Sequence, residues 1–209
     1  MLDLTLALTV GVPLAILIYI VRSDRFPEPS GMVLKTFFIG VAIIIPAGFL
    51  NSFIVTMENS SGYDLSFLAG FTEEPLKFIA FMLFVFSNTD FDEPMDAIVY
   101  GLAVSLGFSA RENIGYVMNY QEYGISFEYM AAIRLIPTVM HAVTSMIMAL
   151  FLSKAIFSNQ SVQKRLILAF LIPVLFHGFY NILITYNFIL GVILLIIGII
   201  YVLTLYRRV

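Results

Sequence analysis

The sequence contains no cysteine, and charged residues are scarce. Asp, Glu, Lys and Arg make up 12% of its 209 residues, whereas they make up roughly a quarter of an average soluble domain. Without thiols, the chain cannot form disulfides, cysteine-ligated zinc sites, iron–sulfur clusters or cysteine nucleophiles. The sequence also shows no separate soluble domain, no low-complexity tract and no convincing internal repeat. We therefore interpret residues 1–209 as a single domain.

Apolar residues are abundant instead, at 60% of the chain, which is typical of an integral membrane protein. The first apolar run, Leu2 to Val21, lacks a basic start and a small-residue cleavage site, so it predicts a retained helix and not a signal peptide. Runs of about 20 residues predict an all-α bundle of about seven transmembrane helices. The predicted helices are residues 2–21, 31–56, 65–86, 95–119, 128–157, 165–185 and 187–206.

The basic residues predict how this bundle is oriented in the membrane. Eight of the eleven Lys and Arg residues lie where a seven-helix topology places them on one face. Cytoplasmic loops are enriched in Lys and Arg, so this face is predicted to be cytoplasmic, with the N-terminus outside and the C-terminus inside. The eight residues are Arg22, Arg25, Lys35, Lys154, Lys164, Arg165, Arg207 and Arg208.

The segment 65–86 carries three charges near its middle, at Glu73, Glu74 and Lys77. Its twelve Leu, Ile, Val and Phe residues favour insertion by about 4 to 7 kcal/mol, whereas each charge opposes insertion by roughly 2.5 to 3.5 kcal/mol. These side chains must therefore face a protein interior or an aqueous cavity, where ionisable residues usually have a function. Pro75 disfavours helical geometry at Glu74 and lacks a backbone donor, so we expect the helix to kink or restart there.

Further ionisable residues are predicted to lie in the same layer of the membrane. At about 1.5 Å per residue, Glu73 and Glu74 lie roughly 13 Å below the outer end of their helix. The corresponding depths are about 10 Å for Glu112, 20 Å for His141 and 12 Å for His177. Because four separate helices contribute to this layer, the sequence predicts one site in the outer half of the membrane.

Residue spacing supports the same site. Lys77 follows Glu73 by four residues and Glu74 by three, so its ammonium group can neutralise part of their charge. Asn181 follows His177 by four residues, on the same helix face. A ridge of small residues in the fourth predicted helix would let a neighbouring helix approach closely. These residues are Ala97, Gly101, Ser105 and Ser109.

Purely structural interpretations of these residues stay open at this stage. The charges of segment 65–86 could form an ion pair between helices, and Glu112 could pair with Arg111 or Arg134. Asn181 could simply donate an interhelical hydrogen bond. We interpret Arg134 and the acidic group from Asp92 to Asp96 as charges at helix ends.

Buried glutamates beside two histidines can support three kinds of chemistry. A glutamate can act as general base on water while His and Asn stabilise the oxyanion. Alternatively, Glu112, His141 and His177 can hold zinc while Glu73 or Glu74 deprotonates the bound water. The same groups can also form an ion or proton pathway in a transporter. A non-catalytic membrane sensor or scaffold is a further alternative, and nothing indicates nucleic-acid binding.

The order of five motifs resembles the PrsW family of bacterial membrane proteases, which is related to the CAAX prenyl endopeptidases. The segment Tyr19 to Gly40, with Asp24 and Glu28-Pro29-Ser30, is also similar to that family's first loop. The resemblance covers residues 19–181, and the combination is specific although each motif alone is weak. The motifs are Glu73-Glu74-Pro75-Leu76-Lys77, Phe91-Asp92-Glu93-Pro94-Met95-Asp96 with Tyr100-Gly101, Gly107-Phe108-Ser109-Ala110-Arg111-Glu112-Asn113, His141-Ala142 and His177-Gly178-Phe179-Tyr180-Asn181.

This resemblance implies an intramembrane endopeptidase of the bacterial cell membrane. Its expected reaction is site-1 cleavage of a single-pass anti-sigma factor on the extracytoplasmic side, as part of a stress response. The resemblance implies that Glu73 and Glu74 are the catalytic pair and that Glu112 replaces a histidine of the CAAX-type relatives. Zinc is slightly favoured over a metal-free glutamate mechanism. The remaining implied site residues are His141, His177 and Asn181, with Lys77 in a supporting role.

Overall fold

The computed structural model describes residues 2–62, 64–158 and 161–206, and all regular structure in these ranges is helical. Arg207 and Arg208 of the predicted basic face lie outside the described residues. The elements are α1 (Leu2–Leu6), the π-helical turn η1 (Ala7–Gly11), α2 (Val12–Ser23), α3 (Ser30–Ser61), the 3-10 turn η2 (Ser66–Leu68), α4 (Ala69–Phe84), α5 (Pro94–Tyr120), the 3-10 turn η3 (Gln121–Tyr123), α6 (Phe127–Ile133), α7 (Leu135–Phe157), α8 (Val162–Tyr186) and α9 (Phe188–Tyr206).

Five helical stretches of the described chain are long and apolar enough to cross a membrane. Because α6 and α7 follow each other with little interruption, they count as one stretch of 31 residues. The predicted helices 65–86 and 95–119 are helical as well, but neither meets the same criteria of length, hydropathy and low charge. The stretches that do are Leu4–Ser23, Ser30–Ser61, Phe127–Phe157, Val162–Tyr186 and Phe188–Tyr206.

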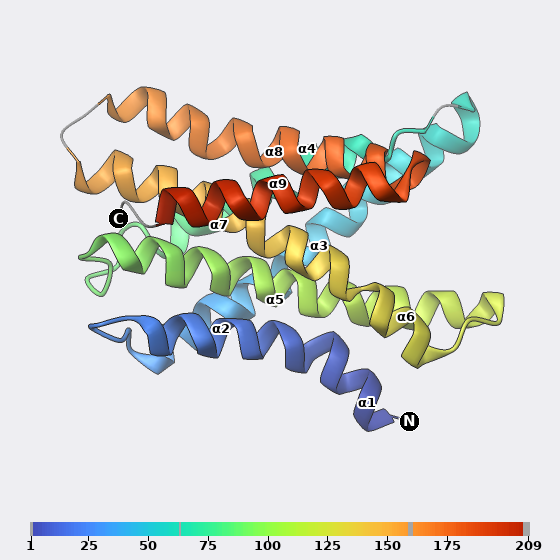
Figure 1. Ribbon diagram of the computed structural model, residues 1–209, viewed down its shortest axis with the longest axis horizontal. Helices are drawn as coiled ribbons and strands as arrows, with labels where there is room; N and C mark the ends of the chain where they lie inside the picture. The colour runs from blue at the N-terminus through green and yellow to red at the C-terminus, as the bar shows by residue number, and fades with distance from the viewer. Residues whose placement is uncertain (1, 63, 159–160, 207–209) are drawn as a thin grey trace.

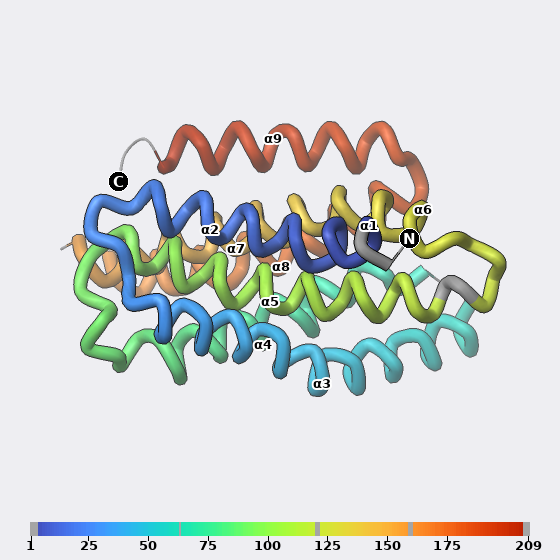
Figure 2. Tube along the Cα trace, turned by 90° about the horizontal axis from the view of Figure 1, so that it is seen from below, coloured from blue at the N-terminus to red at the C-terminus, as the bar shows by residue number. Residues whose placement is uncertain are grey.

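The helices run roughly parallel to one long axis, so their connections gather at two ends (Figure 1). The α5–α6 and α8–α9 connections lie at one end, which we call the α8–α9 end. The α2–α3 and α4–α5 connections lie at the other, which we call the α2–α3 end. Figure 2 shows the same two ends after a quarter turn, with α9 on one side of the bundle and α3 on the other.

Helix α5 forms the centre of the bundle and packs against α2, α3, α4 and α7. Its contact with α3 is backbone to backbone at two glycines. A Cβ atom on Gly40 would collide with the backbone of Val104, and one on Gly107 would collide with the backbone of Phe37. Small residues at such positions let membrane helices approach closely. The absence of side chains at Gly40 and Gly107 therefore sets the distance between α3 and α5.

The predicted ridge of small residues on α5 faces α7. A Cβ atom on Gly101 would lie 3.1 Å from the Ala149 Cβ atom. The Ser105 hydroxyl donates a 2.9 Å hydrogen bond to the backbone carbonyl of His141. Ser109 contacts Thr138 in the same way, at 3.2 Å between the two hydroxyl oxygens. These contacts fix the turn of α7 that carries His141 against α5.

Helix α4 is continuous through Pro75, so the helix does not restart there, which was one of the two outcomes predicted for this position. Proline is tolerated inside membrane helices where neighbouring helices and polar side chains compensate for the lost backbone hydrogen bond. Helices α3 and α8 also contain an internal proline, at Pro46 and Pro173. On the α8 side, a Cβ atom on Gly178 would lie 2.8 Å from the Phe67 carbonyl oxygen, so only glycine lets α8 approach the start of α4 this closely.

Candidate active site

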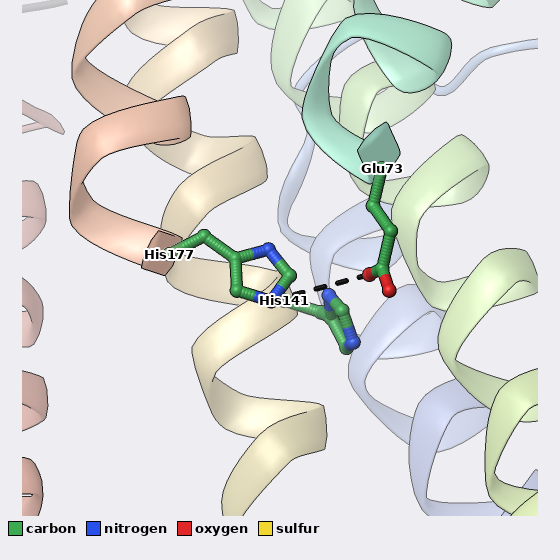
Figure 3. Close-up of side chains that lie close together, drawn as sticks. All are labelled: Glu73, His141 and His177. Atoms are coloured by element: carbon green, nitrogen blue, oxygen red, sulfur yellow. Dashed lines mark ion pairs between the residues drawn. The ribbon is translucent and has the colours of Figure 1, made fainter. Parts of the chain in front are cut away.

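Glu73 of α4, His141 of α7 and His177 of α8 converge in the interior of the bundle (Figure 3). One possible ligand atom from each lies within 4.8 Å of the others. The two imidazole rings stand edge to face with their centroids 5.2 Å apart. At most 2% of each residue is exposed, so all three lie in the protein interior and none faces lipid.

Glu73 has one fixed and one free carboxylate oxygen. The side-chain amide of Asn51 on α3 donates a 2.9 Å hydrogen bond to Oε1. Thr72 in turn donates a 2.6 Å hydrogen bond to the Asn51 carbonyl oxygen, which orients the amide. The second oxygen, Oε2, is buried and has no hydrogen-bond partner among the described residues, and it lies 3.9 Å from His177 Nε2. Glu73 therefore presents an acceptor beside the imidazole ring of His177.

Glu74, the next residue, points into a different environment. Its Oε1 atom lies 2.7 Å from Lys77 Nζ, 2.8 Å from His177 Nδ1 and 3.3 Å from the Thr144 hydroxyl. Lys77 is fully buried, and it pairs with Glu74 three residues earlier and not with Glu73. The adjacent glutamates are thus chemically distinct, because Glu74 is paired with a cation and Glu73 is not.

These contacts fix the protonation pattern of His177. A carboxylate oxygen only accepts hydrogen bonds, so His177 must donate its Nδ1 proton to Glu74. In neutral imidazole the other ring nitrogen then carries the lone pair. In its neutral form, His177 therefore directs the lone pair of Nε2 toward Glu73. Histidines that bind metals usually donate their other N–H group to a carboxylate in this way.

His141 is held from both sides. Its Nδ1 atom lies 2.9 Å from Lys77 Nζ, and its Nε2 atom lies 3.0 Å from Glu112 Oε2. The Lys77 ammonium group has no acceptor, so Nδ1 accepts this bond and Nε2 donates to Glu112. His141 thus connects the ion pair on α4 to Glu112 on α5.

Glu112 forms an ion pair with Arg134 at the junction of α6 and α7. This is one of the structural alternatives considered for Glu112, but the same Oε2 atom also contacts His141. Our interpretation of Arg134 as a helix-end charge is wrong in one respect, because the residue is only 8% exposed and donates a 2.9 Å hydrogen bond to Asn113. Arg134 therefore belongs to the buried polar network.

Asn181 lies one helical turn beyond His177 and contacts the start of α4. Its amide donates a 3.2 Å hydrogen bond to the backbone carbonyl of Ser66. No hydrogen bond joins Asn181 to His177 in the part of the chain that the structure describes. The residue holds η2 against α8 and borders the same pocket as Glu73 and His177.

A pocket of about 770 Å³ reaches this site, a volume typical of ligand-binding cavities. Glu73, Glu112, His141 and His177 line the pocket, whereas Glu74 and Lys77 are not among its lining residues. Glu58 and Asp64 from the α3–α4 region also line it, and so do Tyr186 and Phe188 beside the α8–α9 connection. The pocket therefore lies toward the α8–α9 end of the bundle.

The donor set suits a metal ion with nitrogen and oxygen ligands. Two histidines and one glutamate are the ligands of several catalytic zinc sites. His177 Nε2 and Glu73 Oε2 are already available for ligation. A metal bound by all three residues would replace one of the two contacts that His141 makes, to Lys77 or to Glu112. The three residues best placed to bind a metal therefore include Glu73, whereas the sequence suggested Glu112 beside the two histidines.

Sequence reasoning missed two polar residues that support the site. Asn51 orients Glu73, and Thr144 contacts Glu74. Asn51 has a usable signal, because it is an amide in an otherwise apolar stretch of the second predicted helix. Thr144 resembles an ordinary helix residue until its neighbours are known. Asn113, which belongs to one of the quoted motifs, contacts Arg134.

Comparison with known proteins gives one consistent result. The family model of the PrsW family intramembrane metalloprotease matches residues 28–206. Protease PrsW of Bacillus subtilis (strain 168) is 38% identical over 177 residues, which cover 82% of this chain and 78% of the relative. Protease PrsW of Oceanobacillus iheyensis is 35% identical over 173 residues, or 80% of this chain and 77% of the relative. A more distant Protease PrsW, from Clostridioides difficile (strain 630), is 27% identical over 206 residues, or 94% of this chain and 86% of the relative.

No solved structure shows a significant match to this fold. The sequence relationship, in contrast, extends over most of the chain and includes every helix that contributes to the site. With its membrane-spanning helices, the chain belongs to the PrsW family of intramembrane metalloproteases and is a peptide hydrolase of a bacterial membrane.

Proposed function

We propose that this protease performs site-1 cleavage of a single-pass anti-sigma factor near the extracytoplasmic face of the membrane. Glu73 activates the attacking water molecule, and His177 and His141 position it. The observation that carries this mechanism is the free, buried Oε2 atom of Glu73, which lies 3.9 Å from Nε2 of His177, and both residues line the pocket.

Glu73 is the better general base of the two adjacent glutamates. Glu73 lines the pocket, whereas Glu74 does not and is enclosed by Lys77, His177 and Thr144. In the proposed reaction Glu73 accepts a proton from water as the water oxygen attacks the peptide carbonyl carbon. The same carboxyl group then gives this proton to the leaving amide nitrogen as the C–N bond breaks.

Glu74 and Lys77 are assigned to positioning. Glu74 holds the Nδ1 proton of His177, so the lone pair on Nε2 faces the reaction. Lys77 neutralises the Glu74 charge and also contacts His141. Asn181 uses its amide for one hydrogen bond to Ser66, and an amide has a second N–H that can stabilise the oxyanion. These roles need a site that is rigid before the substrate arrives.

We propose zinc as the metal of this metalloprotease site. Glu73, His141 and His177 would hold it, and the ion would lower the pKa of a bound water molecule and polarise the peptide carbonyl. A carboxylate has two oxygens, so Glu73 can contribute to the metal site and still accept a proton. The free Nε2 atom of His177 and the orphaned Oε2 atom of Glu73 support this assignment.

The proposed topology has seven transmembrane helices with the N-terminus outside and the C-terminus in the cytoplasm. In this topology α4 and α5 also cross the membrane, with α5 at the centre of the bundle and α4 packed against α3, α5 and α8. The α8–α9 end then faces outward, and so does the pocket. Cleavage on the extracytoplasmic side, which the family resemblance implies, agrees with this placement.

The test is cleavage of a co-expressed single-pass substrate by purified variants. We expect Glu73→Gln to lower the cleavage rate by about 10²- to 10⁴-fold, the usual contribution of general base catalysis. His177→Ala should abolish cleavage and reduce the zinc content measured by elemental analysis of protein purified without chelator. The matched control is Glu122→Gln, which neutralises an exposed glutamate at the α8–α9 end and should retain full activity.

Metal content separates the two roles of Glu73. If Glu73→Gln is inactive but retains zinc, Glu73 acts as base alone. If it loses zinc together with activity, Glu73 is also a ligand. A folded Glu73→Gln protein with normal cleavage would remove Glu73 from the mechanism. Normal cleavage by His177→Ala would also overturn the proposal.

A further inference from the structure

A second group of carboxylates lies at the α2–α3 end of the bundle, far from the pocket in the chain and in the fold. Asp24 directly follows α2, and Glu28 lies in the connection to α3. Glu93 precedes α5, and Asp96 belongs to its first turn. One carboxylate oxygen from each residue lies within 4.8 Å of the others. Two connections that are distant in sequence therefore bring four acids together.

Two of these acids are buried with one oxygen each left unpaired. Asp96 is fully buried and Asp24 is 8% exposed. Asp24 Oδ1 accepts a 3.0 Å hydrogen bond from the Phe26 amide, but its Oδ2 atom is buried without a partner. Asp96 Oδ2 accepts hydrogen bonds from two backbone amides, each at 2.7 Å, but its Oδ1 atom is likewise unpaired. Buried polar atoms are almost always satisfied, so each of these requires an explanation.

The negative charge of this group is not balanced by the described residues. No described ion pair reaches any of its four carboxylates, although Arg22 and Arg25 are close in sequence. The Arg25 guanidinium group lies over the Phe26 ring instead. Burial, together with the neighbouring Asp96 carboxyl group, raises the pKa of Glu28 to about 8. The Tyr100 hydroxyl donates a hydrogen bond to Glu28, which orients this carboxyl group.

We propose that Asp24, Glu28, Glu93 and Asp96 form a binding site for one hard divalent cation, Mg²⁺ or Ca²⁺. The available ligands are all carboxylate oxygens, which these ions prefer, and no histidine belongs to the group. Backbone amides hold one oxygen of Asp24 and one of Asp96, and the other oxygen of each is available to the ion. The ion ties the α2–α3 connection to the start of α5, the helix that carries Glu112.

The site is tested by direct binding and by thermal unfolding of the full-length protein in detergent, after divalent ions have been removed with chelator. Separate titrations use Ca²⁺ and Mg²⁺, and all are done in the His177→Ala background so that a metal at the catalytic site does not contribute. We expect saturable binding of one ion per chain and a melting temperature that rises with the ion concentration. The ion with the lower dissociation constant is the one that the site selects.

Variants connect the binding to these residues. Asp96→Asn and Glu93→Gln should each weaken binding at least tenfold and remove the rise in melting temperature. Glu93 is partly exposed, so Glu93→Gln should still fold and remains the test variant if Asp96→Asn does not fold. Asp92→Asn changes an exposed carboxylate beside the group and should bind as the parent does. The proposal is overturned if the stripped protein binds neither ion saturably, or if Glu93→Gln binds and melts as the parent does.

Discussion

At the scale of single residues, the site depends on a charge balance in the protein interior. Glu73, Glu74, Lys77, His141 and His177 are all at most 2% exposed. A buried carboxylate is costly unless it is paired and hydrogen-bonded. Lys77 provides this for Glu74 and also holds His141, so one ammonium group supports both histidines of the site.

Removal of Lys77 should therefore destabilise the fold as well as the site. Lys77→Met leaves the Glu74 charge buried without its cation, which typically costs about 3 to 5 kcal/mol of the free energy of unfolding. Glu74→Gln in the same background removes the uncompensated charge. The double variant should lose clearly less stability than the sum of the single variants, as measured by denaturant unfolding in detergent. Strictly additive losses would mean that the two side chains do not stabilise each other.

At the scale of elements, the site depends on how closely three helix pairs approach. Contact of α3 with α5 requires Gly40 and Gly107, and contact of α4 with α8 requires Gly70. The hydroxyls of Ser105 and Ser109 join α5 to α7. These contacts fix the relative positions of Asn51, Glu73, Glu112, His141 and His177, which come from all of these helices.

Two glycines of α3 provide a matched test of this packing. A Cβ atom on Gly40 would collide with the Val104 backbone, whereas one on Gly48 has no atom within 4 Å. We expect Gly40→Ala to cost about 1 to 3 kcal/mol in the free energy of unfolding, as in other overpacked interiors. Gly48→Ala should be neutral or stabilising by up to about 1 kcal/mol, because alanine favours the helix. Equal effects of the two variants on denaturant unfolding would show that α3 and α5 do not need this close contact.

At the scale of the whole molecule, the buried ionisable groups of the described residues lie in two places. The pocket and the glutamate–histidine site lie toward the α8–α9 end, and the four-carboxylate group lies at the α2–α3 end. A carrier would need a polar path between the two ends. The core of α5 between them consists largely of buried small and apolar residues. The arrangement thus suits a site that opens toward one face.

The absence of cysteine makes the orientation directly measurable. Asn59→Cys places a thiol at the exposed end of α3, and Gln163→Cys places one in the first turn of α8. With the proposed topology, a membrane-impermeant maleimide should label Asn59→Cys in intact cells. It should label Gln163→Cys only after permeabilisation. The reverse pattern would place the catalytic pocket on the cytoplasmic side.

The sequence by itself determined the membrane class, the helical segments and the residues that gather at the site. These follow from local quantities, because the cost of a charge in lipid and the length of an apolar run can be read without a fold. Spacing alone also indicated that Lys77 could reach Glu74. It could not exclude Glu73 as the partner of Lys77, and it could not decide whether the helix restarts at Pro75.

Only the tertiary structure decided which atoms face one another. Glu73 contacts Asn51 and lines the pocket, whereas Glu74 contacts Lys77 and His177, although the two glutamates are adjacent in the chain. The tertiary structure also showed that Arg134, at the junction of α6 and α7, belongs to the buried network, and it brought Asp24 next to Asp96. These partnerships depend on the rotation and separation of packed helices, which side chains on other helices set and which no local pattern in the chain records.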